Sequence, residues 1–215
     1  MAGEECASPI SPAPVHVLYF KPTLLGSCLN VLRLLVGPHA RSPLARSPLA
    51  HITVRGLYKA DLREDGLEES LEKILISVSG VRIERLIRNR PPKQWVFYAF
   101  KCVSPDLERL WFDETPPHFW PHITMYRGSA TKRALQFMKE VGRHSYDFSF
   151  TGRELLLWKE SCPYRAVPCS FSDTMISDVL RERVDAKALH EMPFWKRGVL
   201  IRKICSFLSR QSFMG

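Results

Sequence analysis

The sequence predicts an α+β protein made of two similar halves, and three observations support this. Short β-type runs alternate with amphipathic helical runs along the chain. The order strand, helix, proline-rich loop and strand occurs twice, and each closing strand begins His-Ile-Thr, at His51 and at His122. The 215 residues are 45% apolar, which is enough for a buried core. We expect a duplicated bilobal fold in which two antiparallel sheets flank a central cleft, with helices on the outside.

The first repeat is expected to hold a strand, a helix, a loop and a second strand. Residues 16–20 are a short β-type run, and residues 24–36 place apolar side chains at helical spacing. Residues 40–50 read ARSPLARSPLA, and their prolines exclude a helix. Residues 51–56 alternate polar and apolar side chains, as a strand with one polar face does. Residues 66–78 then carry an apolar stripe that predicts an amphipathic helix.

The second repeat is predicted to follow the same order, with added hairpins. Ser104 followed by Pro105 is typical of a helix start, with a capping hydroxyl and a proline at the first helical position. A proline-rich loop, TPPHFWP, leads to the second His-Ile-Thr strand. The expected helices cover residues 106–112 and 131–141, and the expected strands cover 81–88, 94–102, 122–127, 146–158 and 164–171. The first two strands and the last two are each expected to pair as a hairpin.

The chain divides into three parts by composition. Residues 1–14 are expected to form a proline-rich flexible leader, and residues 15–171 are expected to hold the two repeats as one bilobal domain. Residues 172–215 change to helical pieces and are expected to form a C-terminal extension, an appendage to the repeat. Its last helix is predicted to share one apolar face among Leu200, Ile204, Phe207 and Leu208.

The N-terminal residues do not resemble a secretory signal, because they carry two glutamates and no basic start before an apolar run. We therefore expect a cytoplasmic location. The longest apolar stretch, residues 24–36, is interrupted by Ser27, Asn30 and Arg33 and is shorter than the roughly 20 residues of a membrane span. We expect a monomer without a membrane span.

The charge balance favours a phosphate-bearing partner, because 31 Lys and Arg against 22 Asp and Glu give a net charge of +9. The six cysteines form no CxxC pair, which favours reduced thiols. His118 and His122 are four apart, as in helical zinc motifs, but neighbouring prolines forbid that helix. Cys162, Cys169 and His190 match no zinc spacing. We expect no metal or other cofactor.

Both repeated strands are predicted to carry one polar face. Residues two apart in a strand share a face, so His51, Thr53 and Arg55 point one way while Ile52 and Val54 point to the core. The second strand has the same pattern, and its polar positions are His122, Thr124 and Tyr126. If the two halves pack about a pseudo-twofold axis, both polar faces line one cleft.

Two imidazoles in one cleft suit phosphodiester chemistry. With an ordinary pKa near about 6.5, one ring can accept a proton from water while the other donates a proton to the leaving oxygen. The threonine hydroxyls would hold nonbridging phosphate oxygens, and Arg55 would offset the charge that builds up in the transition state. One His-x-Thr strand alone is usually only an exposed face, but two copies at the same place in a repeat favour a paired site. His51 and His122 are therefore the candidate catalytic pair.

At these residues the chain resembles the 2H phosphoesterase superfamily, which is defined by two His-x-Thr/Ser motifs, one in each lobe. HITVRG and HITMYR both match, and the resemblance covers roughly residues 15–171. It implies a bilobal α+β fold and metal-independent hydrolysis of 2′,3′-cyclic phosphates or 2′,5′-phosphodiesters of nucleotides or RNA ends. It also implies catalytic roles for His51 and His122, with phosphate contacts from Thr53 and Thr124.

Arg127 stands where many members of that superfamily carry an arginine. Strict alternation along the strand turns Arg127 away from Thr124, so Arg55 and Tyr126 rank at least as high as substrate ligands. Aromatic residues of the preceding strand, such as Phe97, are more often core residues than base-stacking platforms.

Two other functions stay open at this point. A nucleotide or RNA binding module would keep the cleft without turnover, and RNA 2′-5′ ligation would use the same residues in the reverse reaction. The sequence leaves open which nucleotide is preferred, which oxygen keeps the phosphate and which histidine is the base. The basic residues near the C-terminus are a solvated helix face, an RNA surface or a lipid surface.

Overall fold

The structure is a computed structural model that describes residues 15–21, 23–36, 50–54, 72–87, 94–109, 120–160 and 192–211. Several expectations fall wholly or partly outside these residues. They are the leader 1–14, the ARSPLARSPLA loop apart from Ala50, Arg55, residues 66–71 and 110–112 of two expected helices, the strand 164–171 and residues 172–191 of the extension.

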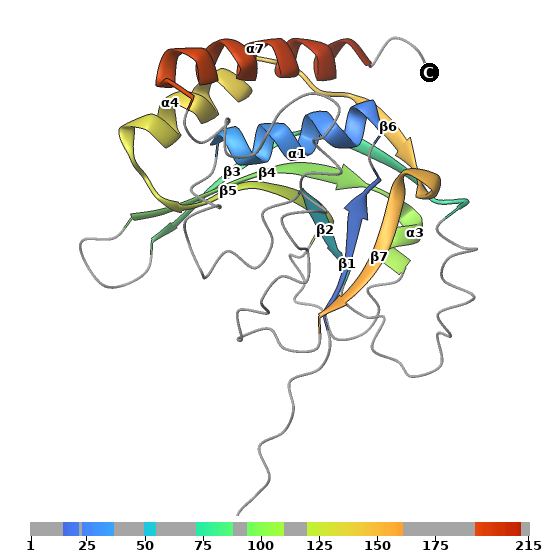
Figure 1. Cartoon of the computed structure of the whole chain (residues 1–215). Helices are drawn as coiled ribbons and strands as arrows, with labels where there is room; N and C mark the ends of the chain where they lie inside the picture. Colours follow the sequence, from blue (N-terminus) through green and yellow to red (C-terminus); the bar gives the residue numbers. More distant parts are fainter. Residues whose placement is uncertain are drawn as a thin grey trace, which may run out of the picture.

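The described strands form one seven-stranded antiparallel sheet, and α-helices accompany it, so the α+β class is confirmed. The strand order is β6-β3-β4-β5-β2-β1-β7. The strands are β1 (Val15–Phe20), β2 (His51–Val54), β3 (Leu75–Ile87), β4 (Gln94–Val103), β5 (His122–Ser129), β6 (Phe148–Thr151) and β7 (Leu155–Glu160). The helices are α1 (Leu24–Val36), α3 (Pro105–Arg109), α4 (Lys132–Val141) and α7 (Phe194–Arg210), with a 3-10 turn η1 (Gly152–Glu154). Figure 1 shows α1, α4 and α7 together above the sheet.

The expectation of two separate sheets differs from this arrangement. Strands β2 and β5, which carry the His-Ile-Thr motifs, pair directly and join all seven strands into one sheet. On either side of this pair lies the neighbouring strand from earlier in the chain, β1 beside β2 and β4 beside β5, both antiparallel. The pairing of β2 with β5 therefore makes the sheet continuous at the place where a gap between two separate sheets was expected.

The sheet is curled, because β6 and β7 follow each other in the chain but lie at opposite edges. Only the three residues of η1 separate them. The rings of Phe20 on β1 and Phe150 on β6 meet edge to face with centroids 4.9 Å apart. The N–H of Lys21 also donates to the carbonyl of Glu154 over 2.7 Å. The expected hairpin arm 146–158 is thus split between two edges of the sheet.

Most of the expected elements are present near their predicted bounds. The helix at 24–36, the hairpin of β3 and β4 and the helix at 132–141 are confirmed. Ser104 Oγ accepts a hydrogen bond from the N–H of Leu107 over 3.2 Å, which is the predicted cap of α3. The helix expected over 66–78 is wrong in its last part, because β3 begins at Leu75 and pairs with β4 and β6.

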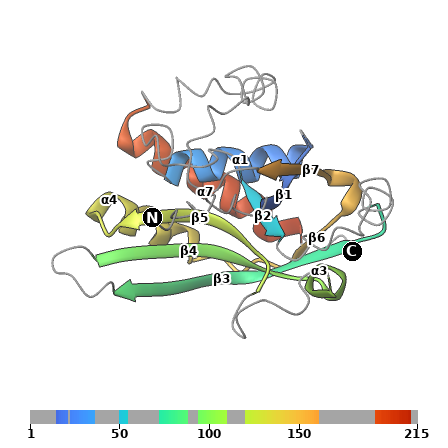
Figure 2. The same cartoon turned by 90° about the horizontal axis from the view of Figure 1, so that it is seen from below.

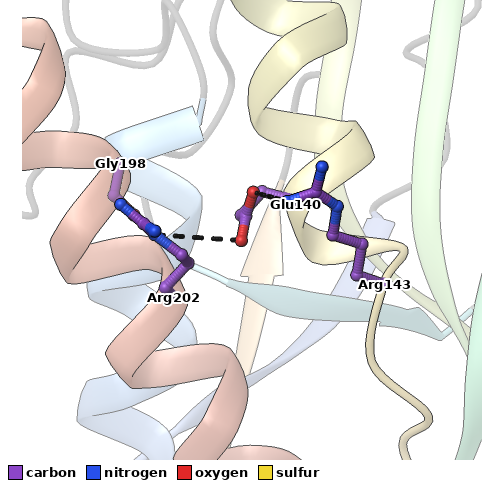
Figure 3. A network of polar contacts seen from close by, with 4 residues as sticks. All are labelled: Glu140, Arg143, Gly198 and Arg202. Carbon is purple, nitrogen blue, oxygen red and sulfur yellow. Dashed lines mark hydrogen bonds and ion pairs between the residues drawn. The ribbon is translucent and has the colours of Figure 1, made fainter.

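Helix α7 is part of the main core rather than an appendage. Ile201, Cys205 and Leu208 are fully buried, and they belong to the same cluster as the sheet residues under α1. Helix α7 packs against α1 and α4. Figure 3 shows one polar contact of this interface, in which Arg202 Nε lies 3.9 Å from Glu140 Oε1. The described part of the expected extension, residues 192–211, therefore supplies the last helix of the domain.

Candidate active site

The two His-Ile-Thr motifs lie side by side in the middle of the sheet. Strands β2 and β5 pair antiparallel with Ile52 opposite Ile123, and both isoleucines are fully buried in the core under the helices. Side chains alternate along a strand, so the histidine and threonine of each motif point to the other face. Figure 2, seen from below, shows β2 beside β5 on this side of the molecule.

The register sets the geometry of the four motif side chains. Because Ile52 is opposite Ile123, His51 stands across from Thr124, and Thr53 stands across from His122. All four residues are half-buried. The two histidines are diagonal neighbours, whose Cα atoms in such a pair lie about 7–8 Å apart. The pairing thus brings both imidazoles and both hydroxyls to one face of the sheet.

A backbone hydrogen bond and two aromatic rings hold the His122 ring. Nδ1 lies 2.9 Å from the carbonyl oxygen of Trp120. A carbonyl only accepts, so Nδ1 carries a proton, and in the neutral ring the lone pair lies on Nε2. The ring centroid lies 4.8 Å from Trp120 and 5.2 Å from Phe97, the latter edge to face. Phe97 therefore lies on the site face of β4, as a wall of the His122 position.

The His51 ring packs against Tyr19 of β1. The ring centroids are 5.6 Å apart, and Tyr19 is the direct cross-strand partner of His51. Tyr19 and Val17 are both buried, but neither belongs to the main core cluster under the helices. Tyr19 is not among the site residues predicted from the sequence. The alternation of side chains along residues 16–20 could have indicated it, because alternation places Val17 and Tyr19 on the face opposite Leu18 and Phe20.

A bulge in β5 changes the face of the residues after Thr124. The pairing with β4 shifts between Tyr98 and Ala99, so that Ala99 pairs with Thr124 and Tyr98 pairs with Tyr126. Met125 is the extra residue, and it is buried in the main core beside Tyr126. Arg127 is exposed. Arg127 therefore shares the face of the motif, and the expectation from strict alternation is wrong.

Tyr126 lies on the core side of β5 and does not join the motif face. Its hydroxyl donates to the carbonyl of Ser129 over 2.5 Å, and its ring lies 6.3 Å from that of Tyr98. Burial raises the pKa of the Tyr126 hydroxyl. These contacts give Tyr126 a structural role, so the structure separates it from the four motif side chains.

Two exposed cations lie on the site face beside the second motif. Lys101 of β4 is the direct partner of His122, and Arg127 is the direct partner of Phe97. Both side chains are exposed. Lys101 is not among the residues predicted from the sequence, although the spacing of Phe97, Ala99 and Lys101 along one strand indicates a shared face. These cations favour a negatively charged ligand at the His122 end of the site.

Helix α1 contacts each motif strand from the core side through one polar side chain. Asn30 Oδ1 accepts a hydrogen bond from the N–H of Ala50 over 2.8 Å, directly before His51. Arg33 Nη1 donates to the carbonyl oxygen of Thr124. In the sequence, both residues stand out only as interruptions of an apolar stretch.

Among the described residues, no group of three His, Cys, Asp or Glu side chains is placed to hold a metal ion. None of the described helices combines the length and apolarity needed to cross a membrane. The expected site residue Arg55 and the alternative ligands His118, Cys162, Cys169 and His190 lie outside the described part of the chain.

Comparisons with protein-family models, with curated proteins and with solved structures find no match to this chain. The case for its function therefore depends on its own residues and their geometry.

Proposed function

We propose that the protein is a metal-independent phosphodiesterase that opens 2′,3′-cyclic phosphates of nucleotides or RNA ends, as its resemblance to the 2H phosphoesterases implies. The observation that carries this proposal is the antiparallel pairing of the two motif strands, with Ile52 opposite Ile123. That register puts two imidazoles at diagonal positions on one face, with a threonine across from each. A phosphorus atom between the rings would have an acid on one side and a base on the other.

The fixed ring of His122 favours it as the base. Its Nδ1 proton is directed at the Trp120 carbonyl, so Nε2 is the atom that accepts a proton from the attacking water. The water oxygen forms a bond to phosphorus, and the bond from phosphorus to one ribose oxygen breaks. Protonated His51 gives its proton to that oxygen, which leaves a phosphate monoester and a ribose hydroxyl. Thr53 and Thr124 hold the nonbridging oxygens, and Arg127 and Lys101 offset their charge.

The first test is turnover of adenosine 2′,3′-cyclic phosphate with and without EDTA. We expect equal rates in both conditions. His51→Ala and His122→Ala should each lower kcat by about 100-fold or more, because each removes one proton-transfer group. His144→Ala is the matched control, since its ring packs near Tyr146 beyond the end of α4.

Loss of turnover with EDTA, or unchanged rates in both motif variants, would reject the proposal. Binding of adenosine monophosphate without any product would favour the binding module instead. Joined product from cleaved RNA ends would favour ligation, and a product analysis of the cyclic substrate gives the oxygen that keeps the phosphate.

A further inference from the structure

Helix α1 holds two of the three polar side chains that are buried in the described part of the chain. These three are Asn30, Arg33 and Ser104, and Ser104 is accounted for as the cap of α3. Asn30 and Arg33 are three residues apart, so they lie on the same face of α1. That face is turned to the sheet, where Asn30 contacts Ala50 directly before β2 and Arg33 contacts β5. Each contact therefore ends on one motif strand.

Stability alone gives little reason for an arginine at this position. Its neighbours Leu32 and Leu34 are buried apolar residues, and an unbranched apolar side chain such as methionine would fill similar space without the desolvation of a cation. Burial lowers the pKa of the Arg33 guanidinium to about 10, although nearby Tyr19 acts in the opposite direction. Arg33 is therefore still charged at neutral pH.

The bond from Arg33 ends beneath the residue that is expected to hold the phosphate. Its acceptor is the backbone carbonyl of Thr124, and the Thr124 side chain points to the opposite face of the sheet. A charge inside the core acts through a medium of low dielectric and is screened by salt much less than a surface charge. The field of Arg33 is therefore screened less than that of a surface cation on its way to the motif face.

We infer that Arg33 is a positioning residue of the two-histidine site, which fixes the Thr124 strand and supplies a buried positive charge that strengthens the binding of a phosphate on the far face of the sheet. The inference rests on the proposed function for the location of the phosphate. The test of this inference does not require catalytic turnover, because a phosphate monoester is attracted by the same positive charge.

The experiment compares the affinities of adenosine 3′-monophosphate and adenosine, which differ only in the phosphate. Arg33→Gln removes the charge and keeps a side-chain N–H donor, although on a shorter side chain. We expect it to weaken binding of the monophosphate about tenfold or more and to leave adenosine binding unchanged. Arg33→Lys, which restores the charge, should recover most of the loss. Arg33→Met removes both charge and donor, and Arg33→Gln remains informative if that variant does not fold.

Arg143→Met is the matched control for net charge. Arg143 is an exposed cation on the turn after α4, where it pairs with Glu140 over 2.7 Å. The Arg143→Met substitution should leave the affinities for adenosine 3′-monophosphate and for adenosine unchanged. Arg33→Gln with the affinities of the native chain would overturn the inference, and so would an Arg33→Lys variant as weak as Arg33→Gln.

Parallel turnover assays separate this inference from the proposed function. A native chain that binds the monophosphate through Arg33 but opens no cyclic phosphate would refute the phosphodiesterase and support the role of Arg33. A native chain that opens cyclic phosphates, with a KM unaffected by Arg33→Gln, would support the phosphodiesterase and refute the role of Arg33.

Discussion

The bulge at Met125 decides which residue after the second motif can touch a substrate. It reverses the alternation of β5, so that Arg127 joins the face of His122 and Tyr126 enters the core. The extra residue Met125 therefore places Arg127, rather than Tyr126, on the face of the motif. A reading of the sequence by strict alternation cannot find this, because nothing in HITMYRGS marks Met125 as the extra residue.

This exchange predicts opposite outcomes for two adjacent variants. Arg127→Met should lower kcat/KM for a cyclic phosphate about tenfold, because it removes a cation from the site face. Tyr126→Phe should keep the activity and lower the free energy of unfolding by about 1 kcal/mol, through loss of the bond to the Ser129 carbonyl. Steady-state kinetics and urea unfolding of both variants check this. If Tyr126→Phe lost activity and Arg127→Met did not, the placement of Arg127 on the site face and of Tyr126 in the core would be wrong.

The aromatic rings beside His122 predict a preference for substrates that carry a base. Trp120 is half-buried and packs on the His122 ring, and aromatic faces stack bases with about 1–3 kcal/mol each. Trp120→Ala should therefore reduce kcat/KM more for a nucleoside cyclic phosphate than for a cyclic phosphate without a base. Trp120→Phe, which keeps a ring, is the control. Equal losses on both substrates would show that Trp120 only supports His122.

At the scale of single elements, the approach of α1 to β1 depends on a glycine. A Cβ at Gly26 would clash with the carbonyl oxygen of Lys21 and lie 2.8 Å from the Cβ of Phe20. The first turn of α1 would have to move away from the strand. Since α1 also holds Asn30 and Arg33 under the motif strands, such a shift reaches the site.

We therefore expect Gly26→Ala to lower the free energy of unfolding by about 1–3 kcal/mol and to reduce phosphodiesterase activity. Thermal unfolding and kinetics on the same samples provide the measurement. Gly198→Ala in α7 is the control, because a Cβ there meets nothing within 4 Å. Gly198→Ala should be neutral or slightly stabilising, as expected for alanine in a helix. If Gly26→Ala and Gly198→Ala changed stability and activity equally, the close approach of α1 to β1 at Gly26 would be contradicted.

Local patterns predicted most elements, and long-range pairing decided the rest. The apolar spacing of 24–36 and the cap at Ser104 act within a few residues, so both helices could be predicted. The apolar pattern of residues 74–78 is compatible with an amphipathic helix and with a strand. The segment is a strand because it pairs with β4 and β6. The paired histidines were predictable from the repeat, but Arg33 was not, because its role depends on a carbonyl in another element.

For the molecule as a whole, α7 completes the helical layer and closes the core over the sheet. Its Cys205 is fully buried, with the Tyr146 hydroxyl close enough to form a hydrogen bond with its thiol. The Tyr146 hydroxyl also donates to the carbonyl of Val141 at the end of α4. The C-terminal helix is thereby joined to α4 and to the strand that follows it, and one unfolding transition should involve the whole described domain.

This burial predicts a loss of stability at alkaline pH. Burial raises the pKa of the Cys205 thiol from 9.0 to about 11, because the thiolate is poorly solvated inside the core. The unfolded chain therefore loses this proton first as pH rises, so stability falls from near pH 9 and continues to fall until about pH 11. The contribution is of order 3 kcal/mol over that window. Urea midpoints from pH 7.5 to 11 should decrease more steeply for the native chain than for Cys205→Ala. A variant with the same slope as the native chain would show that the Cys205 thiol does not contribute to this loss of stability.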